Sequence, residues 1–381
     1  QERKVGLKLD QSQKKAVRAV LKHKVLIVTG GPGTGKTTIV RFILGLMHPK
    51  IPSIALAAPT GRAAKRITET TGSSSSTIHR LLEATNVGFQ RNRENPLDQE
   101  LIIIDETSMI DTLLMDSLLE AVPSASRLII VGDVDQLPSV GAGTVLQDFI
   151  KSGSIPVVRL NHIFRQAYGS FITVNAHKVR RGELPFVNKS SKQSNLENQL
   201  QDYYFIEESD QNKIVEKILL LNTERIPQRF KLDPMKEIQV LTPMHRGITG
   251  ASQLNRNLQE KINPDAKGIE HREQWFRVGD KIMQQQNDYE KQVFNGDLGR
   301  VVDCDQDSKE LYVKFEQSHI HYKSNELDQL TLAYAITVHK SQGSEYSAVI
   351  MPITTHHYMM LQRNLLYTAI TRGKQLVVLI G

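Results

Sequence analysis

Short apolar runs bounded by polar turn residues recur along the first part of the chain. Runs without alternation are typical of strands that are buried on both faces of a parallel sheet. They lie at residues 25–29, 53–58, 100–104 and 128–131. Helical patterns separate them, so this part is predicted to be an α/β lobe whose strands run parallel.

The second part repeats this texture and adds an interruption. Apolar runs return at residues 203–206, 238–242, 330–334, 348–351 and 375–380. Between residues 268 and 327, short alternating segments and turns replace the helical patterns, which predicts a small all-β insertion. The sole tryptophan, Trp275, is expected in the core of this insertion; a base-stacking platform is the alternative.

The first apolar run leads into a glycine-rich turn, and a helical pattern follows. This context is typical of a phosphate-binding loop, whose backbone N–H groups point at one concavity next to a helix N-terminus. Lys36 would reach the β- and γ-phosphates of a nucleotide, and the Thr37 hydroxyl would hold Mg²⁺. The whole segment is Gly30, Gly31, Pro32, Gly33, Thr34, Gly35, Lys36, Thr37 and Thr38.

Acidic and amide side chains follow the next buried runs. Asp105 and Glu106 come directly after run 100–104, and Asp133 and Gln136 come after run 128–131. The carboxyl ends of parallel strands meet at one edge of a sheet, so these side chains are expected beside the phosphate loop. Asp105 would hold Mg²⁺, and Glu106 would polarise the attacking water. A surface acidic pair is the alternative, but it fits poorly after a buried strand.

The composition favours a polyanionic partner. The 381 residues carry a formal net charge of +7, with a pI of about 9.2. Arg62, Lys65 and Arg66 share one side of a predicted helix, where they could meet phosphates or form a solvated face. The lone Cys304 fits a reducing compartment, and no apolar run approaches the roughly 20 residues of a membrane span. A cytoplasmic location is therefore expected.

The order of these motifs resembles that of superfamily 1 helicases, and most closely the RecD-type branch of superfamily 1B. The resemblance covers nearly the whole chain. Its motifs match Gln13, Gly30–Thr38, Pro59–Arg62, Thr77–Arg80, Asp105–Glu106, Gly132–Pro138, Leu160–Gln166, Val338–Glu345 and Tyr367–Arg372.

The resemblance implies an α/β fold of two tandem RecA-like lobes with an SH3-like insertion in the second lobe. The expected first lobe is 1–160, with a duplex-splitting pin at 85–99. The second lobe is 161–267 and 328–381, divided by the insertion at 268–327.

The resemblance also implies roles for individual residues. Arg165 and Arg372 would be arginine fingers, Gln136 would couple the γ-phosphate to DNA, and Gln13 and Glu345 would contact the nucleotide. Residues expected to bind DNA are Pro59, Thr60, Arg62, Thr77, His79, Thr337 and His339.

The implied activity is ATP- and Mg²⁺-dependent 5′→3′ movement on single-stranded DNA, with unwinding at junctions during repair or recombination. A nuclease is not expected, because no convincing set of carboxylates is present. Alternatives are an RNA-directed motor and a nucleotide-gated clamp on single-stranded DNA. We further expect a monomer of the type independent of the RecBC subunits, a missing N-terminal domain, and other repair proteins as possible partners.

Overall fold

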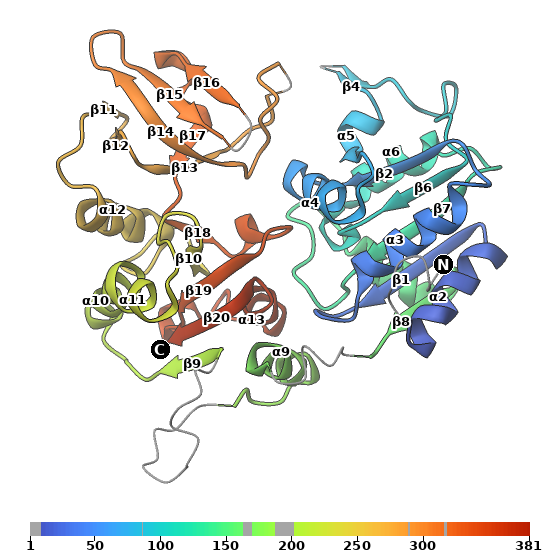
Figure 1. Ribbon diagram of the computed structural model, residues 1–381, viewed down its shortest axis with the longest axis horizontal. Helices are drawn as coiled ribbons and strands as arrows, with labels where there is room; N and C mark the ends of the chain where they lie inside the picture. Colours follow the sequence, from blue (N-terminus) through green and yellow to red (C-terminus); the bar gives the residue numbers. More distant parts are fainter. Residues whose placement is uncertain (1–8, 86, 163–169, 187–201, 289, 316–317) are drawn as a thin grey trace. The chain divides into compact units, whose positions relative to one another are not determined.

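The computed structural model describes residues 9–85, 87–162, 170–186, 202–288, 290–315 and 318–381. The chain divides into two compact units, Gln1–Gly169 and Ser170–Gly381. Each unit is built around its own parallel sheet (Figure 1). No helix in the described ranges is both long and apolar enough to cross a membrane.

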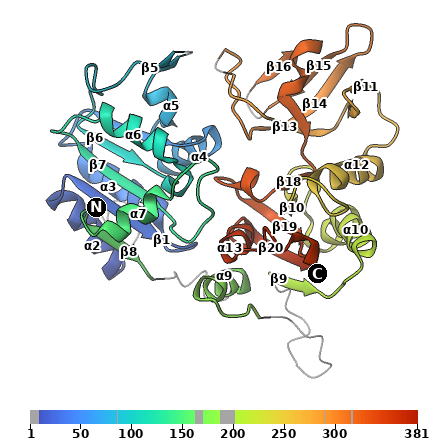
Figure 2. The ribbon, with the colours of Figure 1, turned by 180° about the vertical axis from the view of Figure 1, so that it is seen from behind.

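The first unit contains one parallel sheet with the strand order β3-β2-β6-β7-β1-β8. The tiny β4–β5 hairpin protrudes beside it (Figure 2). Its elements are α2 (Gln11–Lys22), β1 (Val25–Gly30), α3 (Lys36–Met47), β2 (Ile54–Ala58), α4 (Gly61–Thr71), β3 (Ser76–Thr77), α5 (Ile78–Leu81), β4 (Ala84–Thr85), β5 (Gly88–Phe89), β6 (Leu101–Ile104), η1 (Thr107–Met109), α6 (Thr112–Ala121), β7 (Arg127–Gly132), α7 (Val145–Ser152) and β8 (Val157–Leu160).

Helices cover both faces of this sheet, which explains the uninterrupted apolar runs. Leu26 and Val28 of β1 pack with α2, α3 and α4, whereas Ile27 between them packs with α6 and α7. Successive strand residues point to opposite faces, so a strand covered on both sides needs an apolar residue at every position. In β6, all four residues are buried.

The second unit holds a parallel sheet with the strand order β18-β10-β19-β20-β9. Helices α10, α11 and α12 lie on one side of it, and α9 and α13 on the other (Figures 1 and 2). The elements of this part are α9 (Phe171–Arg181), β9 (Tyr203–Ile206), α10 (Gln211–Leu220), η2 (Leu221–Arg225), α11 (Ile226–Phe230), β10 (Ile238–Thr242), α12 (Ala251–Ile262), β18 (Ala335–Thr337), η4 (His339–Ser341), β19 (Tyr346–Pro352), η5 (Thr355–His357), α13 (Arg363–Ile370) and β20 (Gly373–Ile380).

An all-β part interrupts this unit, as the sequence predicts. It consists of the β11–β12 hairpin and an antiparallel sheet with the order β16-β15-β14-β13-β17. Its elements are β11 (Gly268–His271), β12 (Gln274–Arg277), β13 (Lys281–Gln284), β14 (Leu298–Asp305), β15 (Glu310–Lys314), β16 (His319–Tyr322), η3 (Ser324–Gln329) and β17 (Leu330–Leu332).

Two sequence predictions in this region are wrong. The parallel sheet does not resume at 330–334: β17 pairs antiparallel with β13, and the parallel sheet resumes only at β18. An apolar run does not reveal where one strand ends and the next begins. Trp275 is 45 % exposed, because its neighbour Phe276 takes the core-facing position of β12.

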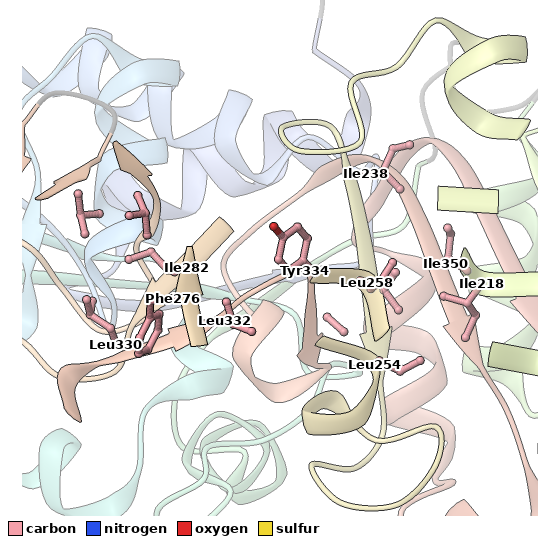
Figure 3. Packing of buried hydrophobic residues seen from close by; sticks show 14 of the residues in the cluster. Ile218, Ile238, Leu254, Leu258, Phe276, Ile282, Leu330, Leu332, Tyr334 and Ile350 are labelled. Atoms are coloured by element: carbon pink, nitrogen blue, oxygen red, sulfur yellow. The ribbon is translucent and has the colours of Figure 1, made fainter. Parts of the chain in front are cut away.

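A single apolar cluster joins the all-β part to the α/β part of the second unit. It runs from Ile218 and Ile350, through Leu258 of α12, to Phe276 and Ile282 (Figure 3). Both covalent connections are fixed by buried polar groups: the Asp280 carboxylate accepts from the Tyr334 hydroxyl at 2.9 Å, and the Gln239 side chain donates to the Tyr334 carbonyl at 3.0 Å. The insertion is therefore packed against its lobe through a shared core.

Candidate active site

The phosphate loop begins at Gly30, the last residue of β1, and runs into the first turn of α3. Gly33 and Gly35 have φ of 69° and 80°, a region in which residues other than glycine are strained. A Cβ on Gly30 would come within 2.6 Å of the Thr34 hydroxyl and 2.9 Å of the Leu160 Cβ. Glycine is thus required both for the turn and for the close packing of its backbone.

Side chains of this loop are held by hydrogen bonds to its backbone carbonyls. The Lys36 ammonium donates to the carbonyls of Gly30 at 2.6 Å and Gly31 at 3.2 Å, and the Thr34 hydroxyl donates to Gly31 at 2.8 Å. The Gln13 amide, buried at the start of α2, donates to the Thr34 carbonyl at 3.3 Å. The structure therefore brings Gln13 to the phosphate loop. Pro32, Thr37 and Thr38 are half-buried.

Asp105 and Glu106 follow β6, which is separated from β1 by β7 in the sheet. Burial raises the pKa of Asp105 to about 6, and the negative charge of Glu106 adds to the rise. The Glu106 N–H bond to Asp105 and the positive charges of Lys36 and Arg66 act in the opposite direction. Asp105 therefore lies within electrostatic reach of the phosphate-loop lysine.

Glu106 is held in an unusual conformation. Its φ is 53°, the left-handed region that residues with a Cβ rarely adopt. Its Oε2 atom is buried and has no hydrogen-bond partner in the described part of the chain. A carboxylate with a strained backbone and an unpaired oxygen at the end of a buried strand is typical of a functional group whose missing partner is supplied by a ligand.

Gln136 lies at the same edge, after β7. Its Nε2 donates to the Asp133 carboxylate at 3.2 Å, while its buried Oε1 has no partner among the described residues. Asp133 is fully buried and also accepts the N–H of Asp135 at 3.1 Å. Asp133 therefore fixes the orientation of the Gln136 amide.

This edge fits a nucleotide with a divalent cation. It combines the N-terminus of a long helix, a lysine and a buried, desolvated carboxylate, together with two buried oxygens that lack hydrogen-bond partners among the residues described. Helix N-terminal N–H groups and lysine suit phosphates, and carboxylate and hydroxyl oxygens suit Mg²⁺. Among the described residues, no group of three His, Cys, Asp or Glu side chains gathers as a self-sufficient metal site.

The remaining nucleotide-site candidates belong to the second unit. Arg372 is 3 % exposed, and its guanidinium donates to Ser344 O at 3.0 Å, Thr368 O at 3.3 Å and Thr371 Oγ1 at 3.3 Å. Glu345 forms an ion pair with Lys374 at 3.6 Å. Arg165 lies outside the described residues.

The DNA-binding candidates of the first unit also have structural roles. The hydroxyl oxygens of Thr60 and Thr77 accept from the N–H groups of Ala63 and Arg80, capping α4 and α5. Thr77 is buried, whereas Pro59, Arg62 and His79 are half-buried. The His79 ring lies 5.7 Å from that of Phe89 in the hairpin, and burial lowers its pKa.

In the second unit, Thr337 and His339 lie together at the carboxyl end of β18. The Thr337 hydroxyl oxygen accepts the N–H of Lys340 at 3.4 Å, and burial lowers the pKa of His339. The Lys340 ammonium donates to Asn295 at 2.9 Å, which ties this end to the all-β part.

Sequence reasoning places two more residues near the site but assigns them no specific role. The position of Asp133 directly after a buried strand predicts it at this edge, but not that its buried carboxylate orients Gln136. Arg66 is expected to meet phosphates from its helix, and the structure adds that its charge acts on Asp105.

Comparisons with known families match three parts of the chain. Residues 13–142 match an AAA domain, and residues 254–315 match the SH3 domain of ATP-dependent RecD-like DNA helicases. Residues 332–380 match the C-terminal domain of UvrD-like helicases.

Curated relatives extend the match over almost the entire chain. The RecD subunit of the RecBCD enzyme from Mycolicibacterium smegmatis is 32% identical over 97% of this chain and 71% of its own length. The ATP-dependent RecD2 DNA helicase of Deinococcus radiodurans is 37% identical over 96% of this chain and 48% of its own length. The chain thus spans about half of the RecD2 helicase and about 70% of the RecD subunit.

Solved structures show the same fold at low sequence identity. Pif1 helicases from Bacteroides, with ADP-AlF3 and single-stranded DNA, and from Candida albicans each align at a TM-score of 0.59 and 19% identity. The alignments cover 98% of this chain and 92% and 94% of those proteins. The expected pair of RecA-like lobes with an SH3-like insertion is confirmed, and the chain belongs to the RecD-type family of superfamily 1 ATP-dependent DNA helicases.

Proposed function

We propose that this chain couples ATP hydrolysis to 5′→3′ movement along single-stranded DNA and to unwinding at single-strand/duplex junctions. The observation that carries the proposal is the edge of the first sheet, where Lys36, Asp105, Glu106 and Gln136 follow three strands of one parallel sheet. The buried oxygens without partners on Glu106 and Gln136 match a site that is completed by a ligand.

The residues of this edge divide the work of phosphoryl transfer. Lys36 and the N–H groups at the start of α3 would bind the phosphates, and Thr37 with Asp105 would hold Mg²⁺. The bound cation supplies charge neutralisation to the phosphate oxygens. Glu106 would accept a proton from the attacking water. The amide of Gln136, which Asp133 orients, would contact the γ-phosphate and couple its presence to DNA binding.

Arg372 and Arg165 would act as arginine fingers on the nucleotide. Glu345 and Gln13 would also contact it. A guanidinium has five N–H donors, and three hydrogen bonds of Arg372 are accounted for in its own unit. At most two donors therefore stay available for phosphate oxygens.

DNA would be held mainly through its phosphates, without readout of sequence. The proposed contacts are the segments of Pro59, Thr60, Arg62, Thr77 and His79 in the first unit and Thr337 and His339 in the second. The β4–β5 hairpin would be the pin that separates the strands, since Val87 at its tip is 93% exposed. Pif1 helicase structures with forked double-stranded and single-stranded DNA support this type of substrate.

Strand displacement on duplexes with a 5′ or a 3′ single-stranded tail tests the proposal. We expect ATP-dependent unwinding from the 5′ tail, because the RecD-type resemblance implies that polarity. The Lys36→Ala variant should lose both unwinding and DNA-stimulated ATP hydrolysis, while Lys22→Ala, an exposed lysine of the same unit, should keep both. Unwinding from the 3′ tail alone would overturn the polarity, and undiminished turnover in Lys36→Ala would overturn the site.

Two alternative functions have distinct outcomes in the same assays. An RNA-directed motor would show ATP hydrolysis stimulated by single-stranded RNA more than by DNA. A nucleotide-gated clamp would bind DNA in an ATP-dependent way without displacing a strand. The family assignment and the SH3 match favour the DNA motor.

A further inference from the structure

The second unit contains a polar pocket of about 390 Å³ that none of the helicase motifs accounts for. One wall is α12 and the loop after β10, which contribute Ser252, Arg256 and His245. The opposite wall is the β11–β12 hairpin, which contributes Gln274 and Trp275, with β17 between the walls. Figure 1 shows the hairpin next to α12.

The hairpin wall is held rigidly. Its turn residues Arg272 and Glu273 have φ of 47° and 63°, as the tight turns of two-residue hairpins require. Asp328 accepts from both His271 at 2.7 Å and Arg272 at 2.6 Å. The buried Gln259 of α12 donates to the Trp275 carbonyl at 2.9 Å. The exposed indole therefore sits on a backbone that is fixed before any ligand arrives, which lowers the entropy cost of binding.

The helix wall supplies positive charge. Arg256 is exposed and has no ion-pair partner in the part of the chain that the structure describes. The neighbouring carboxylate of Glu260 is already paired with Arg277 at 2.6 Å. His245 adds a hydrogen-bonding group, and its ring shares a 3.0 Å hydrogen bond with Ser252. Negative charge in the pocket is therefore concentrated at Glu273, on the opposite wall.

We infer that this pocket holds one nucleotide of single-stranded DNA, with the base stacked on Trp275 and the phosphate beside Arg256 and His245. An indole face binds any base by stacking, and arginine binds phosphate oxygens. Apart from Trp275, only Leu332 of the lining is apolar, so the pocket lacks the dry floor that an apolar peptide anchor needs.

The position of the pocket supports a DNA strand as its occupant. His245 lies in the loop that follows β10, and β10 pairs in parallel with β18, so that Thr242 lies opposite Thr337. One residue of the pocket lining, His245, therefore lies in a loop at the same edge of the second sheet as Thr337 and His339, the residues proposed above to hold DNA. The inference rests on that proposal and extends the DNA-binding surface along this edge to the all-β part.

Trp275 is the single tryptophan of the 381 residues, so its intrinsic fluorescence reports on this pocket alone. We expect saturable quenching when oligothymidylates of about 4–16 nucleotides are added. In parallel, anisotropy of a labelled oligonucleotide measures total binding, and ATP hydrolysis measures stimulation. Trp275→Ala should weaken binding roughly 5- to 150-fold, the range for one stacked base, whereas Trp275→Phe should retain most of the affinity.

Charge variants locate the phosphate. Arg256→Gln should weaken binding and reduce its salt dependence, and Glu273→Gln should strengthen binding. Arg229→Gln changes an exposed arginine of α11 outside this pocket and should have little effect.

Three outcomes contradict the inference. If DNA stimulates ATP hydrolysis normally but Trp275 is not quenched and Trp275→Ala binds like the parent, the pocket assignment fails and the helicase proposal stands. If no oligonucleotide binds by anisotropy, both fail. If oligoglutamate quenches Trp275 and oligothymidylate does not, the pocket is a site for acidic peptides.

Discussion

The two units hold their candidate nucleotide-site residues in opposite chemical states. At the edge of the first unit, buried oxygens of Glu106 and Gln136 have no hydrogen-bond partner among the described residues. In the second unit, Arg372 directly precedes β20 and is 3 % exposed, and three hydrogen bonds to its own unit hold it. The same sheet architecture therefore carries one site that is incomplete without a ligand and one whose arginine is already bonded within its own unit.

This difference indicates separate roles for the two units in nucleotide binding and hydrolysis. An unsatisfied buried oxygen costs about 1–3 kcal/mol, which a ligand with donors or a cation can recover. Nucleotide binding thus stabilises the first unit whether or not the second unit contacts the nucleotide. An arginine that already makes three hydrogen bonds gains less free energy from binding a ligand, so Arg372 is expected to act on the transition state rather than on ground-state binding.

The largest effect is expected from Arg372→Ala. DNA-stimulated kcat should fall by about 10³–10⁵, as for other arginine fingers, while affinity for a fluorescent nucleotide changes only a few-fold. Steady-state hydrolysis and nucleotide titration measure the two separately. Arg363→Ala, an exposed arginine at the start of α13, is the control and should leave both unchanged. A lowered Tm with an equal loss of nucleotide affinity would show that Arg372 is only structural.

Glu106→Gln is expected to have the next largest effect. Removal of the proton acceptor should lower kcat by about 10²–10⁴. The Tm without ligand should stay the same or rise, because the variant replaces a carboxylate whose buried Oε2 has no hydrogen-bond partner among the described residues. Asp116→Asn, an exposed acid of α6, is the control for both measurements. A Tm that falls sharply in Glu106→Gln would contradict the view that this edge is incomplete.

The sequence predicted the first unit well, because burial on both faces leaves a simple pattern. β6 is apolar at every position. The position of the side chains that follow it could be predicted from the rule that the carboxyl ends of parallel strands meet at one edge of the sheet. The left-handed backbone of Glu106 was not predictable, since nothing in the residue type favours φ of 53°. Such strain is imposed by the surrounding fold.

The second unit was predicted less accurately for a physical reason. Residues 330–334 form one apolar run, yet Leu330–Leu332 belongs to the all-β sheet and the parallel sheet begins at Ala335. The change of partner is set by long-range hydrogen bonds from Gln239 and Asn255, which periodicity does not show. Trp275 was assigned to the core by size, whereas strand alternation places Phe276 there.

The smallest effect concerns a contact that the second unit makes within itself, after the carboxyl end of β19. His357, after β19, shares a 3.0 Å hydrogen bond with the Thr249 hydroxyl. Burial, with a contribution from the charge of His356, lowers the pKa of His357 to about 4 from an ordinary 6.5. Between these values the unfolded chain takes up a proton that the folded chain does not. The stabilisation by the neutral ring is therefore complete above pH 6.5 and is lost as the pH falls through 4.

His357→Gln should cost about 1 kcal/mol at neutral pH, the worth of one hydrogen bond, and should flatten the fall of Tm between pH 6.5 and 4.5. Thermal unfolding of the ligand-free protein across this range measures both. His356→Gln, an exposed neighbour, should keep most of the acid sensitivity. An equally steep fall of Tm in His357→Gln would mean that a neutral imidazole does not stabilise the second unit here, and the contrast between the two units would then rest on Arg372 alone.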